Sequence, residues 1–384
     1  MIDLVRLFRS LVRACSMLLV LATWTSAAAK TLLDVDVPLL DQGLPISRAQ
    51  QLEQGIYPEI RRVEAQYFAV ALARALVDTA RFGSVRVVPS EDSTAELTLR
   101  GKILRSDGRE LELSLVAVDA TGRRWLERDF YIATPVPLSS PDDKATTERQ
   151  SDALERLYER ITADLVMALD AHDERELALI REISLLRYAA VLAPQPFAEY
   201  VEWVPPQRAP RSEENDEVLP PLMPPHYRAV RLPSAQDPMI GRITRVRLTE
   251  AQLKDTSHQL YARAVDDVTE GYETWRRFNA QQLAYVEERQ GRFAGTSKKE
   301  RKRRRKARTY ASYKQSYEDY RWAKEQEQRM AAWAARLDTQ ARPTVQEVEG
   351  TLVELEGSLS EQYAEWRRIL RALFELETGV ATTP

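Results

Sequence analysis

The chain has 384 residues, which at roughly 100–200 residues per domain is enough for more than one domain. Hydrophobic residues make up 44% of it, as in ordinary globular proteins. Charged residues make up 29% and the net charge is −3, so the surface is highly charged but nearly balanced. The only cysteine is Cys15, which excludes an intrachain disulfide.

Residues 1–29 have the three parts of a secretory signal peptide. A positive region with three arginines comes first, the apolar run MLLVLA follows at 17–22, and Ser-Ala-Ala-Ala at 26–29 offers small residues for cleavage. The apolar run is far shorter than the ~20 residues that span a bilayer, so we predict a cleaved signal rather than a retained anchor. The predicted location is therefore the periplasm, where the mature chain has no thiol.

Residues 30–192 are predicted to form an α+β domain with the layout βαβββα and a helical extension. Apolar residues alternate at period two in 32–40, which predicts a strand, and the polar residues 41–54 are predicted to form a loop. The helix predicted at 58–81 carries one apolar stripe, and Gly83 is expected to end it. A short strand is predicted at 85–88.

The stretch 95–130 is predicted to hold three consecutive strands joined by two tight turns. The turns are Ser106-Asp107-Gly108 and Ala120-Thr121-Gly122, because glycine accepts the positive φ that such turns need. One polar and one apolar face indicate an antiparallel or mixed sheet that helices cover on one side. Amphipathic helices are predicted at 147–169, packed on this sheet, and at 174–192.

Residues 193–247 are predicted to be a proline-rich linker, because eleven prolines between 194 and 238 remove backbone donors from any helix or strand. Residues 248–384 are predicted to be a long helical hairpin or bundle with coiled-coil character. Capping boxes at Thr249 and at 343–347 precede apolar residues at helical spacing. This apolar seam could close within one chain or between two copies, which leaves a homo-oligomer open.

The basic run at 298–308 is the strongest local signal of binding. Nine of its eleven residues are cationic: Lys298, Lys299, Arg301, Lys302, Arg303, Arg304, Arg305, Lys306 and Arg308. Near an anionic membrane each such charge gains roughly 1 kcal/mol, so lipid or lipopolysaccharide surfaces are candidate partners. The alternative is a solvated helix face. The predicted export argues against nucleic acid as the partner.

No residue pattern predicts catalysis, a cofactor or a metal. His172 lies beside carboxylates, but no second histidine stands at helical spacing from it, so a zinc site is not predicted. Residues 291–298 share only composition with a phosphate-binding loop, because the Gly-Lys-Ser/Thr order is absent. The tyrosines at 310, 313, 317 and 320 are predicted to form a buried helix seam rather than a stacking platform.

Several stretches are similar to known families. A helix ending in ARFGSVRVVP, the strand AELTLRGKIL and the segment LELSLVAVDATGRRWLERDF lie between 68 and 130. Together they resemble the small α/β domain at the N-terminus of the Tol-system periplasmic propeller protein, with Gly101 and 119–122 at comparable positions. IYPEIRRVEAQYF, DPMIGRITRVR and YETWRRFN resemble a family of exported proteobacterial proteins. No propeller repeat follows, so the resemblance does not imply the Tol-system partners.

These patterns favour a non-enzymatic scaffold or adaptor of the cell envelope. It would bind protein partners, of unknown identity, through the sheet edge and the helical seam. The alternative is an accessory protein that binds anionic lipid or another polyanion through 298–308. Salt separates the two hypotheses, because polyanion binding weakens steeply with ionic strength and assembly through an apolar seam does not.

Overall fold

The computed structural model describes residues 32–133, 144–206, 225–234, 237–294, 343–348 and 350–379, together with five single positions between 321 and 332. The predicted signal peptide and the basic run at 298–308 lie outside the described residues. The same holds for the four tyrosines between 310 and 320.

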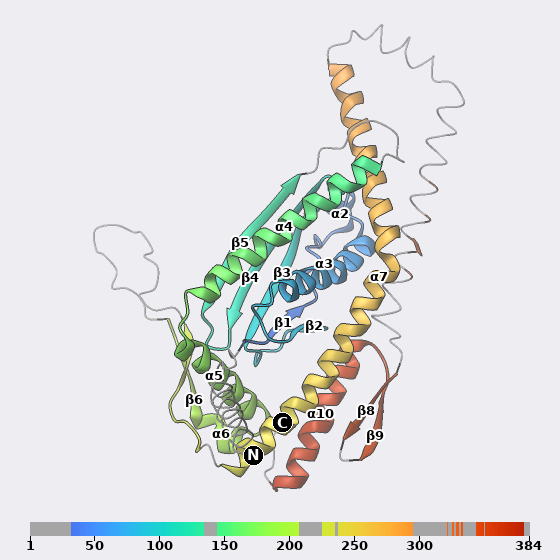
Figure 1. Cartoon of the computed structure of the whole chain (residues 1–384). Coiled ribbons are helices and arrows are strands. Elements are labelled where there is room, and N and C mark those ends of the chain that lie inside the picture. Colours follow the sequence, from blue (N-terminus) through green and yellow to red (C-terminus); the bar gives the residue numbers. More distant parts are fainter. Residues whose placement is uncertain are drawn as a thin grey trace, which may run out of the picture. The chain divides into compact units, whose positions relative to one another are not determined.

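A five-stranded mixed sheet forms the centre of the fold (Figure 1). Its strands lie in the spatial order β2 (Val85–Val88), β1 (Val35–Pro38), β3 (Leu97–Ser106), β4 (Glu110–Asp119) and β5 (Arg124–Ala133). β1 pairs in parallel with β2 and β3, whereas β3, β4 and β5 form an antiparallel meander. Both predicted glycine turns are confirmed, since φ is 84° at Gly108 and 88° at Gly122.

The predicted layout βαβββα names four strands, whereas the sheet has five. The fifth is β2, at the position 85–88 where a short strand is also predicted, and it pairs with β1. The predicted loop at 41–54 contains a short helix, α2 (Arg48–Glu53). Helix α3 (Pro58–Asp78) ends before the predicted Gly83, and Ala80, with φ 51°, takes the left-handed conformation instead.

Helices cover one face of the sheet, as predicted. α3 and α4 (Lys144–Asp170) both lie on the viewer's side of the sheet in Figure 1. Alternate residues of β4 are fully buried beneath them: Leu111, Leu113, Leu115 and Ala117. Burying a leucine contributes about 1.5–3 kcal/mol, so this face holds most of the core. The intervening residues of β4 lie on the opposite face and are only partly buried.

Residues after the sheet are more regular than predicted. α5 (Glu174–Leu192) begins at a capping box made by Asp173 and Glu176. In the predicted linker, α6 (Pro194–Phe197) and the 3-10 helix η1 (Ala198–Tyr200) lead into β6 (Val201–Val204), which pairs antiparallel with β7 (His226–Ala229). Among the described residues, Pro194 starts α6 and Pro205 and Pro225 flank the two strands, positions where a missing backbone N–H costs little, so this part of the predicted linker does form regular structure.

The helical region predicted to begin at 248, called the arm below, begins earlier in the structure, at Pro238. α7 (Pro238–Ala294) has 57 residues and is about 85 Å long at 1.5 Å per residue. Pro238 is its first residue, where a missing N–H costs nothing. The predicted helix start at Thr249 is wrong, because the Thr249 hydroxyl donates to the Arg245 carbonyl, 3.0 Å away, inside the helix. No described helix is both long and apolar enough to cross a bilayer.

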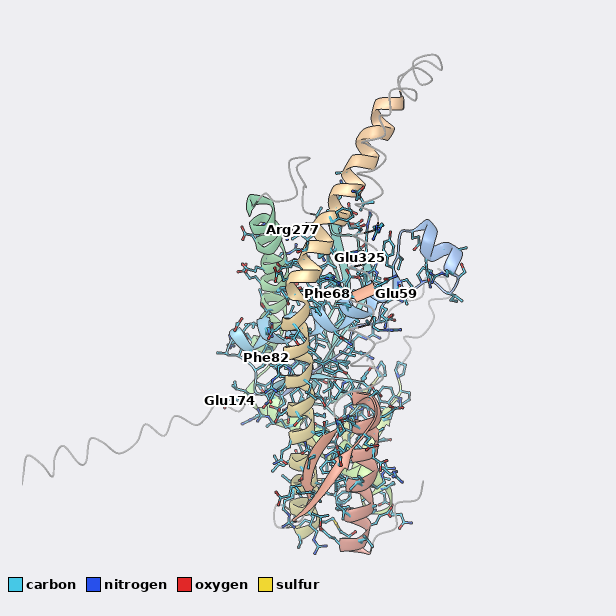
Figure 2. All side chains as sticks on the ribbon, turned by 90° about the vertical axis from the view of Figure 1, so that its right-hand side faces the viewer. Glu59, Phe68, Phe82, Glu174, Arg277 and Glu325 are labelled. Atoms are coloured by element: carbon cyan, nitrogen blue, oxygen red, sulfur yellow. The ribbon has the colours of Figure 1, made fainter. Side chains whose placement is uncertain are left out.

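The predicted helix start at 343–347 is also wrong. β8 (Thr344–Val348) and β9 (Thr351–Leu355) form a hairpin there, consistent with their many β-branched residues. α10 (Leu359–Thr378) follows, with a capping box at Ser358, and packs against α7 with Trp366 fully buried. Figures 1 and 2 both show α10 and the hairpin beside the first half of α7.

Candidate functional site

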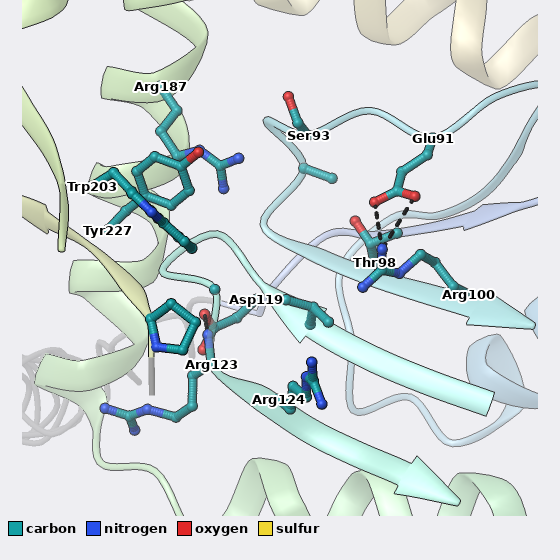
Figure 3. Close-up of a pocket in the computed structure, with 14 residues that line it drawn as sticks. Glu91, Ser93, Thr98, Arg100, Asp119, Arg123, Arg124, Arg187, Trp203 and Tyr227 are labelled. Carbon is teal, nitrogen blue, oxygen red and sulfur yellow. Dashed lines mark hydrogen bonds and ion pairs between the residues drawn. The ribbon is translucent and has the colours of Figure 1, made fainter. Parts of the chain in front are cut away.

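A cavity of about 530 Å³ opens on the face of the sheet that the helices leave uncovered (Figure 3). Its walls come from the loop 89–96, the ends of β3, β4 and β5, helix α5 and the β6–β7 hairpin. We call it the arginine–tryptophan cavity, after Arg100, Arg123, Arg124, Arg187 and Trp203, which line it. Its volume falls within the range of about 300–1,000 Å³ that is typical of ligand pockets.

An aromatic pair forms one wall of the cavity. Trp203 of β6 stands opposite Tyr227 of β7, and their ring centroids are 4.7 Å apart. The Tyr227 N–H donates to the Thr121 carbonyl at 2.6 Å, which ties the hairpin to the second turn of the sheet. Trp203 is 48% exposed, so an indole held in place by backbone contacts remains accessible to a ligand.

Three of the four arginines that line the cavity are neutralised at its rim. Their partners are Glu91 for Arg100, Glu176 for Arg123 and Glu127 for Arg124, at 3.2, 3.2 and 2.5 Å. All six side chains are more than 40% exposed. Such exposed pairs contribute about 0–1 kcal/mol, so a ligand could replace either partner at small cost.

Arg187 differs from these three arginines. Its guanidinium stacks on the Tyr227 ring, 3.9 Å from the centroid, and donates to the Ala120 carbonyl at 2.7 Å. It forms no ion pair with any carboxylate of the described residues. Burial lowers the pKa of Arg187 and outweighs the opposing effects of Tyr227, Asp92 and Asp119.

The carboxylate of Asp119 also lines the cavity but is fully engaged in the turn. One oxygen accepts from the Thr121 N–H, the Thr121 hydroxyl and the Arg123 N–H. The other accepts from the Trp125 indole at 2.8 Å. Asp119 therefore fixes the conformation around Gly122 and has little remaining capacity to act as an acid or base.

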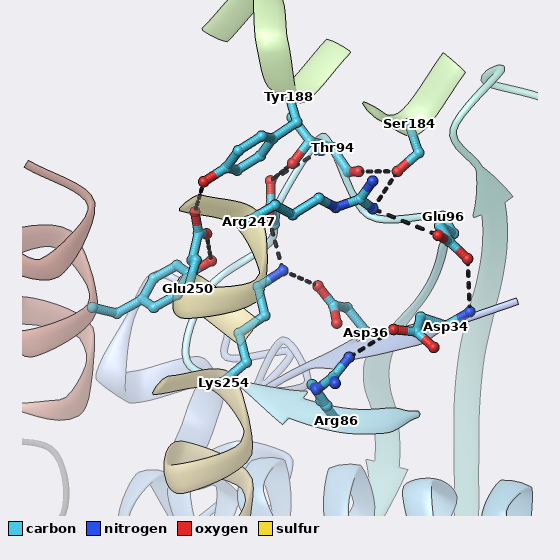
Figure 4. A network of polar contacts seen from close by, with 12 residues as sticks. Asp34, Asp36, Arg86, Thr94, Glu96, Ser184, Tyr188, Arg247, Glu250 and Lys254 are labelled. Carbon is cyan, nitrogen blue, oxygen red and sulfur yellow. Dashed lines mark hydrogen bonds and ion pairs between the residues drawn. The ribbon is translucent and has the colours of Figure 1, made fainter. Parts of the chain in front are cut away.

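A buried charge cluster lies on the other side of the loop 89–96 (Figure 4). It joins the sheet to α5, α7 and α10 through five carboxylates and five cations: Asp34, Asp36, Asp92, Glu96, Glu250, Arg86, Arg181, Arg247, Lys254 and Arg367. The space left inside it is about 50 Å³, far below the roughly 300 Å³ at the lower end of ligand pockets. We therefore interpret the cluster as structural.

Lys254 of α7 is the centre of this cluster. Its Nζ lies 2.6 Å from Asp36 Oδ2 and 2.8 Å from Asp92 Oδ2, and all three side chains are buried. Burial alone would lower the pKa of Lys254, but the two carboxylates outweigh it and raise that pKa. Burial raises the pKa of Asp36, whereas Lys254 overcomes the burial of Asp92 and holds its pKa far below the usual range.

Glu250, one turn before Lys254, ties three helices together. Its two oxygens accept from the Tyr188 hydroxyl of α5 at 2.8 Å and from the Tyr363 hydroxyl of α10 at 2.5 Å. Arg367 of α10 lies 3.6 Å away. Because these contacts join both α5 and α10 to α7, Glu250 fixes the position of α7 against its two neighbouring helices.

The structure places the other residues that the sequence singled out. Gly101 lies against the core, where a Cβ would come within 2.9 Å of the side chains of Leu40 and Leu115. His172 stacks on Trp125 at 4.6 Å, and the described residues contain no group of metal-binding side chains around it. The polyanion-binding residues predicted at 298–308 lie outside the described residues.

No pattern in the sequence predicts the cavity. Trp203 and Tyr227 fall in the segment predicted to be a linker, and Arg187 falls on a helix with no distinguishing motif. The only local signal was the pairing of short alternating segments, VEWV and HYRA, on either side of the prolines.

Comparisons with protein-family models, with curated proteins and with solved structures found no match to this chain. The resemblance of residues 68–130 to the small α/β domain of the Tol-system propeller protein therefore stays a prediction.

Proposed function

We propose that the protein is a non-enzymatic adaptor of the cell envelope that binds a protein partner in the arginine–tryptophan cavity. The carrying observation is the half-exposed Trp203, held against Tyr227 at the mouth of an open cavity. Tryptophan, tyrosine and arginine are the residues that most often dominate protein interfaces. The envelope location rests on the signal peptide predicted at 1–29.

Binding fits the cavity better than catalysis does. Asp119 is engaged in turn hydrogen bonds, and Glu91 pairs with Arg100. The charge cluster next to the cavity is closely paired and leaves no room for a substrate. General acid–base chemistry needs a titratable group within hydrogen-bond reach of the substrate, and Asp119 is already held by four hydrogen bonds of the turn.

The basic run at 298–308 supports a second candidate function, the binding of anionic lipid or another polyanion. Nine cations in eleven residues are its only support. Sedimentation with anionic vesicles tests it, using the full chain and a variant with Ser and Gln throughout the run. Loss of binding in that variant would favour this function, and unchanged binding would exclude it.

In-cell photo-cross-linking tests the adaptor function. A photoreactive residue at Arg124, on the cavity rim, should yield a discrete cross-linked protein. The same residue at Met167, an exposed position of α4, should not. The product should be lost with Trp203→Ala and kept with Tyr131→Ala, which removes an exposed aromatic ring from outside the cavity wall. A product that is insensitive to Trp203→Ala, or no discrete product from the rim, would refute the proposal.

A further inference from the structure

Arg187 brings a positive charge into the cavity that the described part of the protein does not balance. Two carboxylates, Asp92 and Asp119, act on it electrostatically. Both are engaged elsewhere, because Asp92 pairs with Lys254 and Asp119 is held by four hydrogen bonds of the turn. Partly desolvated charges in proteins are normally paired, so this guanidinium calls for a partner that the chain itself does not provide.

The position of Arg187 suits the capture of a ligand. Its stacking on Tyr227 and its bond to the Ala120 carbonyl fix the plane of the guanidinium. Figure 3 shows the group extending past the tyrosine ring toward the interior of the cavity. A fixed guanidinium plane presents parallel N–H donors, which match the two oxygens of a carboxylate.

The remaining walls indicate what should adjoin that anion. Trp203, Val118 and Pro225 supply apolar lining to the cavity. The three rim ion pairs are neutral as pairs and Asp119 is negative, so Arg187 leaves a single positive charge to neutralise, and a second negative charge on the ligand would find no partner. This arrangement favours a monoanionic carboxylate over a dianionic phosphate.

We propose that the cavity binds an acidic, extended segment of a protein partner. One carboxylate pairs with Arg187, and a neighbouring apolar or aromatic side chain packs on Trp203. This inference rests on the proposed adaptor function, for which it names the chemistry of the partner. Arg187 is the residue that selects for the anion, and Trp203 is the residue that selects for the apolar neighbour.

Fluorescence anisotropy with labelled hexapeptides tests the ligand chemistry. The probe is Gly-Asp-Phe-Gly-Gly-Gly with both ends blocked. Three comparison peptides replace Asp by Asn, Phe by Ala, or Asp by phosphoserine. The full chain should bind the first peptide, and the Asn peptide should bind about 10- to 100-fold more weakly, as expected for the loss of charge-assisted hydrogen bonds. The phosphoserine peptide should also bind more weakly than the Asp peptide.

Variants of the protein complete the test. Arg187→Gln should weaken binding of the Asp peptide about 10- to 100-fold but leave binding of the Asn peptide unchanged. Arg187→Lys should bind the Asp peptide with an affinity between those of the wild type and Arg187→Gln, because lysine keeps the charge but lacks the planar guanidinium. Arg368→Gln is the matched control, since Arg368 is an exposed arginine of α10 paired with Glu365, and it should bind like the wild type.

Each outcome is decisive for this inference. Equal binding of the Asp and Asn peptides, or no binding of either, would overturn it, and so would tighter binding of the phosphoserine peptide. The peptide comparison uses the unaltered protein, so misfolding of a variant cannot produce this result. If the rim cross-link depends on Trp203 while the carboxylate makes no difference, the adaptor function stands and only the anionic partner is refuted.

Discussion

Replacing Lys254 by methionine should destabilise the protein severely at neutral pH. Two carboxylates lie within 2.8 Å of its Nζ, and each contact gains about 6 kcal/mol at an effective dielectric constant of ~20, before desolvation is counted. Removing one partner from a buried ion pair typically costs about 3–5 kcal/mol, because the remaining charges stay buried without compensation. Methionine fills a similar volume, so the loss should come from charge and not from a cavity.

The destabilisation should depend on pH in a defined direction. Without Lys254, Asp36 and Asp92 both lose their nearest cation, and their folded-state pKa values should rise above the unfolded value of ~3.9. A group with a raised folded pKa stabilises the fold at low pH and loses that contribution as the pH rises. In the wild type, Asp92 has a lowered pKa, so its contribution is present above the unfolded pKa and lost as the pH falls. The difference between Lys254→Met and wild type should therefore shrink from pH 7 toward pH 4.

Urea unfolding of the full chain, followed by circular dichroism at pH 7 and pH 4.5, measures this effect. A triple variant, Lys254→Met with Asp36→Asn and Asp92→Asn, serves as the control, because it removes the uncompensated charges and should regain most of the lost stability. A loss below about 1 kcal/mol at pH 7 would be no more than an average substitution and would refute the reasoning. A loss that does not change with pH would refute it equally.

Three further predictions concern a turn, a contact between α7 and β2, and a helix cap, and urea unfolding checks each. Gly108→Ala should lower the free energy of unfolding clearly more than Gly55→Ala. Both glycines have positive φ, which costs any other residue about 1–2 kcal/mol. Only at Gly108 would the added Cβ also meet a carbonyl oxygen of α7, at 2.3 Å. An equal loss of stability in the two variants would contradict the role of this contact. His258 accepts a hydrogen bond from the Val87 N–H, and burial lowers the pKa of its imidazole. Its contribution to stability should therefore be full above pH ~6.5 and be lost as the pH falls. The variant His258→Gln should not show this decline. Ser358→Ala removes the N-cap of α10 and should lower the free energy of unfolding by about 1 kcal/mol. An unchanged free energy of unfolding would mean that packing alone defines the start of this helix.

The sequence predicts the sheet better than the arm because the sheet is encoded locally. The alternation in β3 and β4 and the positive φ needed at Gly108 and Gly122 are each readable within a few residues. The hairpin β8–β9 was missed because its apolar residues also fit a helical spacing, and only the turn at Gly350, with φ 78°, decides between the two. Period alone cannot separate a short hairpin from a helix start.

The candidate site could not be predicted for a different reason. Arg187 and Tyr227 meet although 40 residues separate them, and Lys254 meets Asp36 across more than 200. No local pattern marks such pairs, because each residue type is common and ordinary at its own position. The sequence directed attention to the basic run at 298–308 since charge density is visible locally, whereas a single unneutralised arginine becomes visible only in three dimensions.

The loop 89–96 connects the two polar features of the fold. Asp92 points into the charge cluster, where one oxygen meets Lys254 and the other accepts from the Thr94 N–H. Its neighbours Glu91 and Ser93 line the arginine–tryptophan cavity. Because alternate residues of one short loop serve the two features, the pairing of α7 with Asp92 also fixes one wall of the cavity. A buried ion pair adds little net stability over an apolar contact, but it depends strongly on geometry. We therefore interpret the buried charges as fixing the position of α7 relative to the loop 89–96.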